Sequence, residues 1–344
     1  MRKLATIRRV DALCPIPDAD AIECAVIGGW TAVVKKGEYA VGDLAVYLEI
    51  DSWVPTELAS FLSKGKEPRV FEGIKGERLR TVKLRGQLSQ GLLLPLDVLP
   101  ADDDFNGVWV EGEDVSEILG IVKWERPMNA QLAGMARGNF PSVIPKTDQE
   151  RVQNLKSEID QAITDCLQFE VTEKLEGSSM TVYLIDGVFG VCSRNLDLKD
   201  TEDNTLWQVA RLNGIEEKLR SLDMDNVAIQ GELIGPGIQG NIYKLSKPEF
   251  WVFDIYNIKM GEYVTPAARR RYVDQLGLLH VPVMAASADL HDTLGLKNVE
   301  DILKWAEGAS ALTTKQEREG IVFKQADGGM TFKAISNKYL LGEK

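Results

Sequence analysis

The sequence is poor in the residues on which several common kinds of active site depend. Its 344 residues contain two histidines, His280 and His291, and four scattered cysteines that form no CxxC pair. So few histidines argue against a His-based triad and a multi-His metal site, and the cysteine pattern argues against a zinc cluster or a disulfide framework. Any chemistry must therefore come from lysine, arginine and carboxylate side chains.

Segments that would direct the chain to a membrane are also missing. No apolar run approaches the length of a membrane span, and the N-terminal MRKLATIRRV has basic residues without the apolar core of a secretory signal. A composition of 44% hydrophobic and 27% charged residues is ordinary for a globular protein, and the length allows two domains. We expect a cytoplasmic monomer that does not bind membranes.

The net charge of −12 argues mildly against nucleic acid as a partner, but it hides a basic stretch between Lys64 and Arg85. Eight lysines and arginines there stand against three glutamates, a local charge of +5. Such a stretch could contact a phosphate backbone. A solvated loop of mixed charge is the alternative.

The pattern of short strands and turns divides the chain. Residues 1–122 contain β-rich runs such as 31–50 and 78–96, which predict a small closed barrel or sandwich. Residues 123–145 are rich in Pro, Gly and Asn and predict a linker. Residues 146–344 alternate strands and helices, which predicts an α+β domain built on antiparallel sheet.

Helix signals mark the second domain. Thr147 and Glu150 form a capping-box pattern ahead of an apolar face at Val152, Leu155, Ile159 and Ile163, so a helix should begin near Thr147. Further helices are predicted at 205–221, 266–276 and 298–308. The predicted strands are 168–175, 179–185, 188–193, 227–235, 250–257, 320–325 and 330–335.

Lys174 lies in the sequence EKLEGSS, residues 173–179. A lone KxxG is weak evidence, and the chain has a second one, KLRG, at 83–86. Only Lys174 is followed by an ordered set of polar motifs in β-rich segments: SRN at 193–195, GEL at 231–233, FWVFDIYN at 250–257, EGIVFK at 319–324 and FKAISNKY at 332–339.

In this order the motifs resemble those of the covalent nucleotidyltransferase superfamily, which includes DNA ligases, RNA ligases and mRNA capping enzymes. Only eleven residues follow Lys333, which leaves no room for the C-terminal OB domain of DNA ligases and capping enzymes. With its N-terminal β module and the segment IPKTDQERVQN, the chain closely resembles the RNA ligase 5 family. The resemblance implies an N-terminal OB-like β-barrel followed by an antiparallel-sheet adenylyltransferase domain.

The resemblance also implies a role for each motif residue. Lys174 would attack the α-phosphorus of ATP and form lysyl–AMP, although a solvated lysine has a pKa near ~10.4 and must first lose its proton. Lys324 and Lys333 would neutralise the phosphates, Phe253 would stack on adenine, and Arg194 would reach the ribose or phosphates. Glu173 would also contact the nucleotide. The carboxylates expected around Mg²⁺ or Mn²⁺ are Glu176, Glu232 and Glu319.

Each of these residues also has a plain structural reading, because most charged residues on strands are solvated and Phe253 could be core. One position departs from the family pattern: Ile335 stands where many members have a second lysine, so Lys333 must act alone or another cation, such as Lys338, must compensate. Lys146 and Arg151 could contact the nucleotide or only cap the helix.

The function implied is an ATP-dependent RNA ligase that seals 3′-OH/5′-phosphate nicks in duplexes with RNA on the 3′-OH side. The N-terminal module would contact the nucleic acid through the basic stretch with Trp53 or Phe71, as OB folds do, or it would only pack and solubilise. The alternatives are a ligase acting on DNA ends, a GTP-using capping enzyme, and a nucleic-acid-binding module with a degenerate, non-catalytic domain.

Overall fold

The computed structural model describes residues 2–100, 108–125 and 134–342, which form two compact units. Unit 1 is Met1–Pro127 with Gln153–Lys156, and unit 2 is Met128–Val152 with Ser157–Lys344. The predicted linker at 123–145 spans this division, and its residues 126–133 lie outside the described part of the chain. The predicted domain boundaries therefore stay a prediction.

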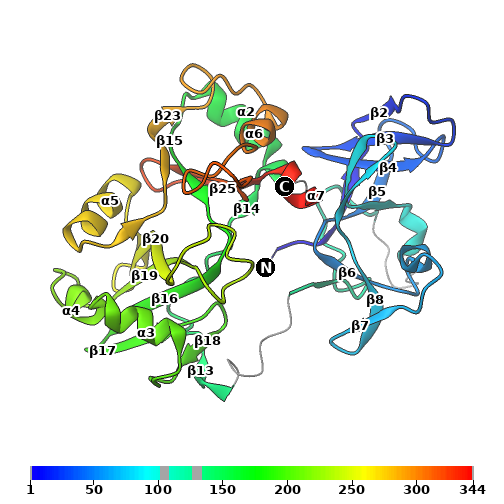
Figure 1. Ribbon diagram of the computed structural model, residues 1–344. Helices are drawn as coiled ribbons and strands as arrows, with labels where there is room; N and C mark the ends of the chain where they lie inside the picture. The colour runs from blue at the N-terminus through cyan, green and yellow to red at the C-terminus, as the bar shows by residue number, and fades with distance from the viewer. Residues whose placement is uncertain (1, 101–107, 126–133, 343–344) are drawn as a thin grey trace. The chain divides into compact units, whose positions relative to one another are not determined.

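Unit 1 is built from short antiparallel strands (Figure 1). One sheet has the order β1-β5-β11, a second β2-β3-β4, a third β12-β6-β8-β7, and β9 pairs with β10. The alternation in WTAVVK buries Trp30, Ala32 and Val34 on one face of β4, and Ile7 of β1 packs in a core with Val46 and Leu48 of β5. The strands are β1 (Ala5–Arg9), β2 (Ala12–Pro15), β3 (Ile22–Ile27), β4 (Trp30–Lys35), β5 (Leu44–Leu48), β6 (Ser52–Pro55), β7 (Arg69–Phe71), β8 (Ile74–Arg78), β9 (Thr81–Leu84), β10 (Gln87–Gln90), β11 (Leu92–Leu94) and β12 (Val122–Lys123).

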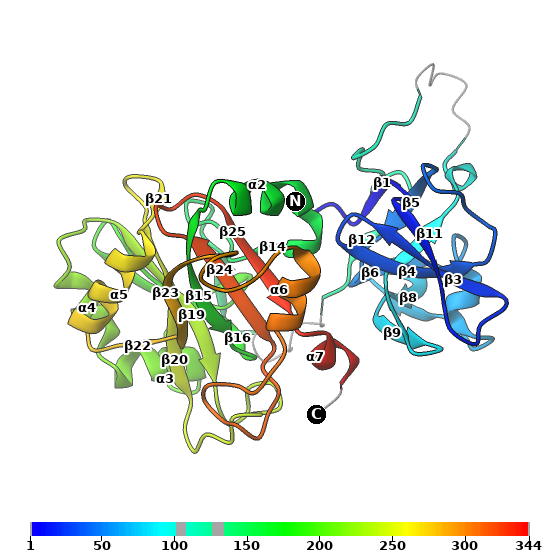
Figure 2. The ribbon, with the colours of Figure 1, turned by 90° about the horizontal axis from the view of Figure 1, so that it is seen from above.

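Unit 2 contains two sheets. The larger has the order β13-β18-β17-β16-β19-β20-β21, with β22 also paired to β20; the smaller has the order β14-β25-β24-β15-β23. Figure 2 shows β24 and β25 of the smaller sheet side by side. The strands are β13 (Ala136–Asn139), β14 (Glu150–Arg151), β15 (Gln168–Lys174), β16 (Ser178–Ile185), β17 (Val188–Cys192), β18 (Leu196–Leu198), β19 (Val227–Ile234), β20 (Glu249–Asn257), β21 (Glu262–Tyr263), β22 (Leu279–His280), β23 (Val283–Asp289), β24 (Gly320–Gln325) and β25 (Thr331–Ile335).

Helices bury the apolar face of the larger sheet. Trp207, Leu219 and Val273 from three different helices lie in one core with strand residues such as Val182 and Ile229. This arrangement confirms the predicted α+β domain with mostly antiparallel sheet; among the strand pairs of the described residues, β14–β25 and β20–β22 are the parallel ones. The helices of unit 2 are α2 (Lys156–Thr164), α3 (Thr205–Leu212), α4 (Ile215–Arg220), α5 (Pro266–Gln275), α6 (Val299–Trp305) and α7 (Asn337–Leu341).

Two of the predicted helices differ from the structure. The helix predicted to begin near Thr147 is wrong there, because Glu150 and Arg151 pair with β25 and α2 begins only at Lys156. The helix predicted at 205–221 is broken at Gly214, whose φ of +58° ends α3 and starts α4. The predictions at 266–276 and 298–308 are confirmed by α5 and α6 within three residues at each end.

Trp53 was a candidate for nucleic-acid contact, but the structure places its side chain in the interior, 2% exposed. Its ring lies 5.4 Å from that of Phe71, which is half-buried and also faces Trp124. Arg78 belongs to the same cluster, with its guanidinium 3.9 Å from the Trp124 ring centre and an ion pair to Asp51. The other basic side chains of the stretch are exposed: Lys64, Lys66, Arg69, Lys75, Arg80, Lys83 and Arg85.

Over the ranges that the structure describes, no helix combines the length and apolar character needed to cross a membrane.

Candidate active site

Lys174 lies where the chain passes from the smaller sheet of unit 2 to the larger one. It is the last residue of β15, and β16 begins at Ser178 in the other sheet. The β15–β24 register sets Lys174 opposite Gly320, which brings the preceding residue, Glu319, alongside. The Lys174 Nζ is 2.7 Å from the Glu319 Oε1, and both side chains are largely buried.

Gly177 allows this crossing to run close against β19. A Cβ at position 177 would lie 2.4 Å from the Leu233 carbonyl oxygen and 2.9 Å from the Glu232 Cγ. Heavy atoms do not approach so closely, so a side chain would force the KLEG segment away from β19. The glycine of this motif is therefore required by close backbone approach.

We expect Gly177→Ala to destabilise unit 2 by about 1–3 kcal/mol, the usual range for overpacking, and to reduce ATP-dependent labelling. The reason is that moving the KLEG segment also moves Lys174 relative to Glu232. The matched control is Gly138→Ala, because a Cβ at position 138 meets nothing within 4 Å. Urea unfolding and labelling of both variants check this, and equal stability of the two would contradict it.

Two carboxylates determine the charge state of Lys174. Burial lowers the pKa of this lysine, but Glu319 and Glu232 raise it by more, so its pKa lies above the ordinary value. Burial raises the pKa of Glu232 to about 8, although the Lys174 cation acts to lower it. The resting lysine is thus a cation beside Glu319 and Glu232, and an attack by its nitrogen would require that its proton leave first.

The third carboxylate expected at a metal site, Glu176, faces other partners. Its backbone amide donates to the Tyr243 hydroxyl at 2.7 Å, and its side chain interacts with the Tyr339 hydroxyl. No three His, Cys, Asp or Glu side chains of the described ranges are grouped closely enough to hold one metal ion. The arrangement therefore does not assemble the predicted three-carboxylate set, but Glu232 and Glu319 supply the oxygen ligands that hard cations prefer.

Glu173 is 2% exposed, and neighbouring residues hold its carboxyl in place. Its Oε2 accepts a hydrogen bond from the Ala311 amide at 2.7 Å, and the Ser310 side chain also hydrogen-bonds to the carboxyl. Burial raises the pKa of this carboxyl by more than these hydrogen bonds lower it.

Lys324 is buried, and its ammonium group contacts β20 of the larger sheet. It is 5% exposed, its Nζ is 2.5 Å from the Asp254 Oδ1, and it donates to the Phe253 carbonyl oxygen at 2.7 Å. Its Nζ also lies 5.6 Å from the centre of the half-buried Phe253 ring. Burial lowers the pKa of Lys324 to about 8. Asp254, which sequence reasoning did not single out, is thus the main partner of this lysine.

Lys333 and Ile335 lie on β25, next to the crossing segment. Lys333 pairs with Arg151 of β14 and Val322 of β24, whereas Ile335 is 4% exposed and lies opposite Gly320. Lys338 forms an ion pair with Glu307 at 3.3 Å. Arg151, for which the sequence allowed a nucleotide contact or a helix cap, is 5% exposed and acts to lower the pKa of Lys174, so it is a further cation of this site.

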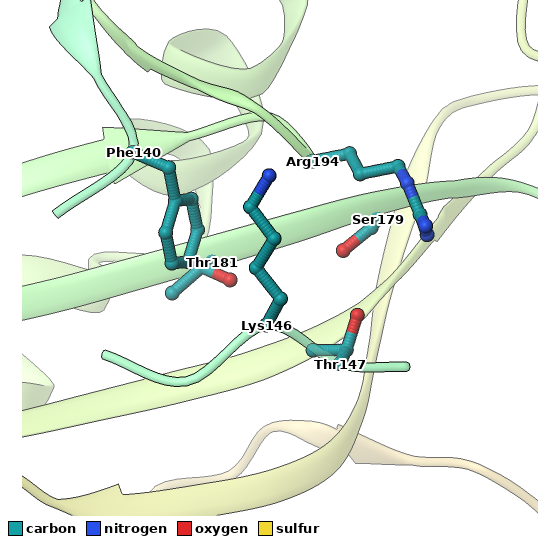
Figure 3. A pocket seen from close by; sticks show the side chains of 6 residues that line it. All are labelled: Phe140, Lys146, Thr147, Ser179, Thr181 and Arg194. Atoms are coloured by element: carbon teal, nitrogen blue, oxygen red, sulfur yellow. The ribbon is translucent and has the colours of Figure 1, made fainter. Parts of the chain in front are cut away.

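A small pocket adjoins the carboxylate side of the site (Figure 3). Arg194 lies at its edge and forms two hydrogen bonds, 2.9 and 3.0 Å long, to the carboxylate of Asp148. Lys146 crosses the pocket and its Nζ donates to the Asn195 Oδ1 at 2.7 Å. Arg194 also acts to lower the pKa of Glu232, so the pocket and the lysine site share one electrostatic environment. The lining residues are Phe140, Lys146, Thr147, Ser179, Thr181 and Arg194.

Comparison with known proteins identifies families for both parts of the chain. A family model described as an OB-fold domain matches residues 4–96, and one described as RNA ligase matches residues 167–339. A search of curated protein sequences found no match.

Solved structures resemble the chain over nearly its whole length. An RNA ligase from Naegleria gruberi with PPi is 48% identical with a TM-score of 0.89, covering 99% of this chain and 98% of that one. A mutant of that ligase with AMP and Mn is 48% identical, with a TM-score of 0.89 and 98% of each chain covered. Another mutant, with ATP and Mn, is 47% identical, with the same TM-score and coverage.

Proposed function

The chain belongs to the RNA ligase family, with an OB-fold domain ahead of the ligase domain, and from this premise we propose that Lys174 is its nucleophile toward ATP. The observation that carries the proposal is the position of Lys174: it ends β15 between Glu319 and Glu232, at the crossing of the two sheets. The ATP, AMP and Mn in the structures of the Naegleria ligase support an ATP- and metal-dependent reaction.

The reaction has three steps. The Lys174 nitrogen, having lost its proton, forms a bond to the α-phosphorus of ATP while the bond to pyrophosphate breaks. The 5′-phosphate of a nicked strand then attacks the lysine-bound AMP, so the N–P bond breaks and the lysine recovers a proton. Finally the adjacent 3′-OH attacks the activated 5′-phosphate, a phosphodiester forms and AMP leaves.

The remaining site residues bind and orient the nucleotide. Phe253 stacks on adenine, Glu173 also contacts the nucleotide, and Arg194 reaches the ribose or phosphates once its ion pair with Asp148 opens. Lys333 neutralises phosphate charge. Glu232 and Glu319 hold Mg²⁺ or Mn²⁺, which when bound would offset the negative charge of the phosphates.

The substrate we infer is a nicked duplex with RNA on the 3′-OH side. The OB-fold domain supports a nucleic-acid partner, and seven exposed lysines and arginines between Lys64 and Arg85 are suited to contacts with its phosphates. Phe71, half-buried beside Trp124, is the aromatic candidate that remains after Trp53.

Sealing of matched nicks tests the substrate. We expect the wild-type protein, with ATP and Mg²⁺ or Mn²⁺, to seal a nick whose 3′-OH strand is RNA and to seal the all-DNA nick far more slowly, as read by denaturing gel. Equal rates on the two nicks would instead support a ligase acting on DNA ends. Labelling by α-labelled GTP but not ATP would support a capping enzyme. No label from either would support a non-catalytic module.

A further inference from the structure

The side chain of Lys324 links the two sheets of unit 2. It extends from β24 of the smaller sheet, and its Nζ donates to the Phe253 carbonyl oxygen on β20 of the larger one, 2.7 Å away. Lys324 is 5% exposed, and its contacts with Phe253 and Asp254 hold the ammonium group in place. The buried ammonium group therefore presents little charge to a phosphate bound outside this contact.

Asp254 is in turn held by a buried charge cluster. Arg269, on α5 and fully buried, lies 3.3 Å from the Asp254 Oδ1 through its Nη1 and binds Glu170 of β15 through its Nη2. Arg270 binds the other oxygen of Glu170. His280 contacts the Arg269 Nε at 3.1 Å, and burial lowers its pKa to about 4, so it is neutral near pH 7. Two carboxylates and three cations thus connect α5, β15, β20 and β24.

The residue that this cluster fixes is Phe253. Its ring packs against an apolar group that includes Leu175, Ile234 and Tyr243, and Leu175 directly follows Lys174. A movement of the Phe253 backbone would therefore shift the ring relative to the nucleophile.

We propose that Lys324, Asp254 and Arg269 form a strut between the sheets that fixes the Phe253 ring beside Lys174, and that Lys324 acts on adenine binding through Phe253 rather than on the phosphates. This rests on the proposed function, in which Phe253 stacks on adenine. Lys324 is then a positioning residue of the ligase.

A double-mutant cycle with Lys324→Met and Phe253→Ala separates the two roles. We expect each single variant to raise the KM for ATP in self-adenylation about 10-fold, within the range for loss of a base-stacking contact, with kcat changed less than threefold. Because Lys324 acts through Phe253, the double variant should be no worse than Phe253→Ala. Additive losses, or a fall in kcat of Lys324→Met alone, would overturn the proposal.

Reaction with pyrophosphate gives a second readout, which separates the strut from direct contact between Lys324 and phosphate. Purified enzyme–AMP of the wild type and of Lys324→Met is mixed with pyrophosphate, and ATP formation is measured. The strut requires the same pyrophosphate dependence in both proteins, whereas direct contact with phosphate requires a weaker dependence in the variant.

Lys324→Met leaves Asp254 with one fewer cation and could fail to fold, so the cycle is repeated with the pair Lys324→Met/Asp254→Asn, which removes opposite charges together. If the rise in KM caused by this pair and the rise caused by Phe253→Ala are additive, the proposal is overturned as well. If the wild type itself takes no label, the proposed function fails; if it takes label and only the cycle is additive, the strut alone fails.

Discussion

The Lys174→Ala protein is expected to carry no AMP after incubation with α-labelled ATP and a divalent metal, whereas the wild-type chain should keep a label that acid releases. The reason is that the proposed reaction joins AMP through the Lys174 nitrogen, and among the described side chains it is Lys174 that interacts with both Glu319 and Glu232. In a serine protease, loss of the nucleophile lowers turnover about 10⁶-fold, so we expect no detectable label here. Denaturing gels of both proteins, with and without acid treatment, measure the result.

A pre-adenylated nick separates this chemical role from a structural one. Lys174→Ala should still seal a strand that already carries the 5′–5′ adenylate, because the last step needs no lysine nucleophile. The matched control is Lys259→Ala, which removes an exposed lysine paired with Asp225 and should take label normally. Label retained by Lys174→Ala would assign the nucleophile to another residue.

Replacing Arg269 by methionine is expected to lower the free energy of unfolding of unit 2 by about 3–5 kcal/mol, the usual loss when one member of a buried ion pair is removed. Glu170 is fully buried and would keep only the partly exposed Arg270 as its cation. Total stabilities are about 5–15 kcal/mol, so the loss is a large fraction. Urea unfolding followed by circular dichroism measures it.

An exposed ion pair provides the matched comparison. Arg220 is bound to Glu216 on α4, and both side chains are more than 40% exposed. Arg220→Met should therefore cost less than about 1 kcal/mol, because water solvates the remaining carboxylate. Similar losses from the two variants would show that the buried cluster contributes little to stability.

Strands and motif order could be predicted because their signals are local. The alternation in QFEVTEK places Phe169 and Val171 in the core and leads directly to Lys174, and the structure has β15 there. Once the strands pair in register, Lys174 and Glu319 must meet, although they are 145 positions apart. The RNA ligase family and the two-part fold are confirmed on this basis.

Other features depend on contacts that no local pattern reveals. Glu150 and Arg151 read as the start of a helix, but pairing with β25, about 180 residues later, satisfies their backbone groups instead. Asp254 and Arg269 read as ordinary charged residues of a strand and a helix, and only the packing of α5 shows that they are bound to each other. Trp53 had the residue type of a base-stacking side chain, but burial removed it from the surface.

The crossing of the chain from β15 to β16 has a consequence for partly folded forms of unit 2. Lys174 and Glu319 belong to the smaller sheet and its edge, whereas Glu232 belongs to the larger, so neither sheet alone contains the whole set. A fragment that carried only one sheet, or an intermediate in which the sheets had not yet joined, would lack the arrangement. If Lys174 takes AMP as we propose, its labelling would report completed assembly of the unit, and an incompletely folded chain would consume no ATP.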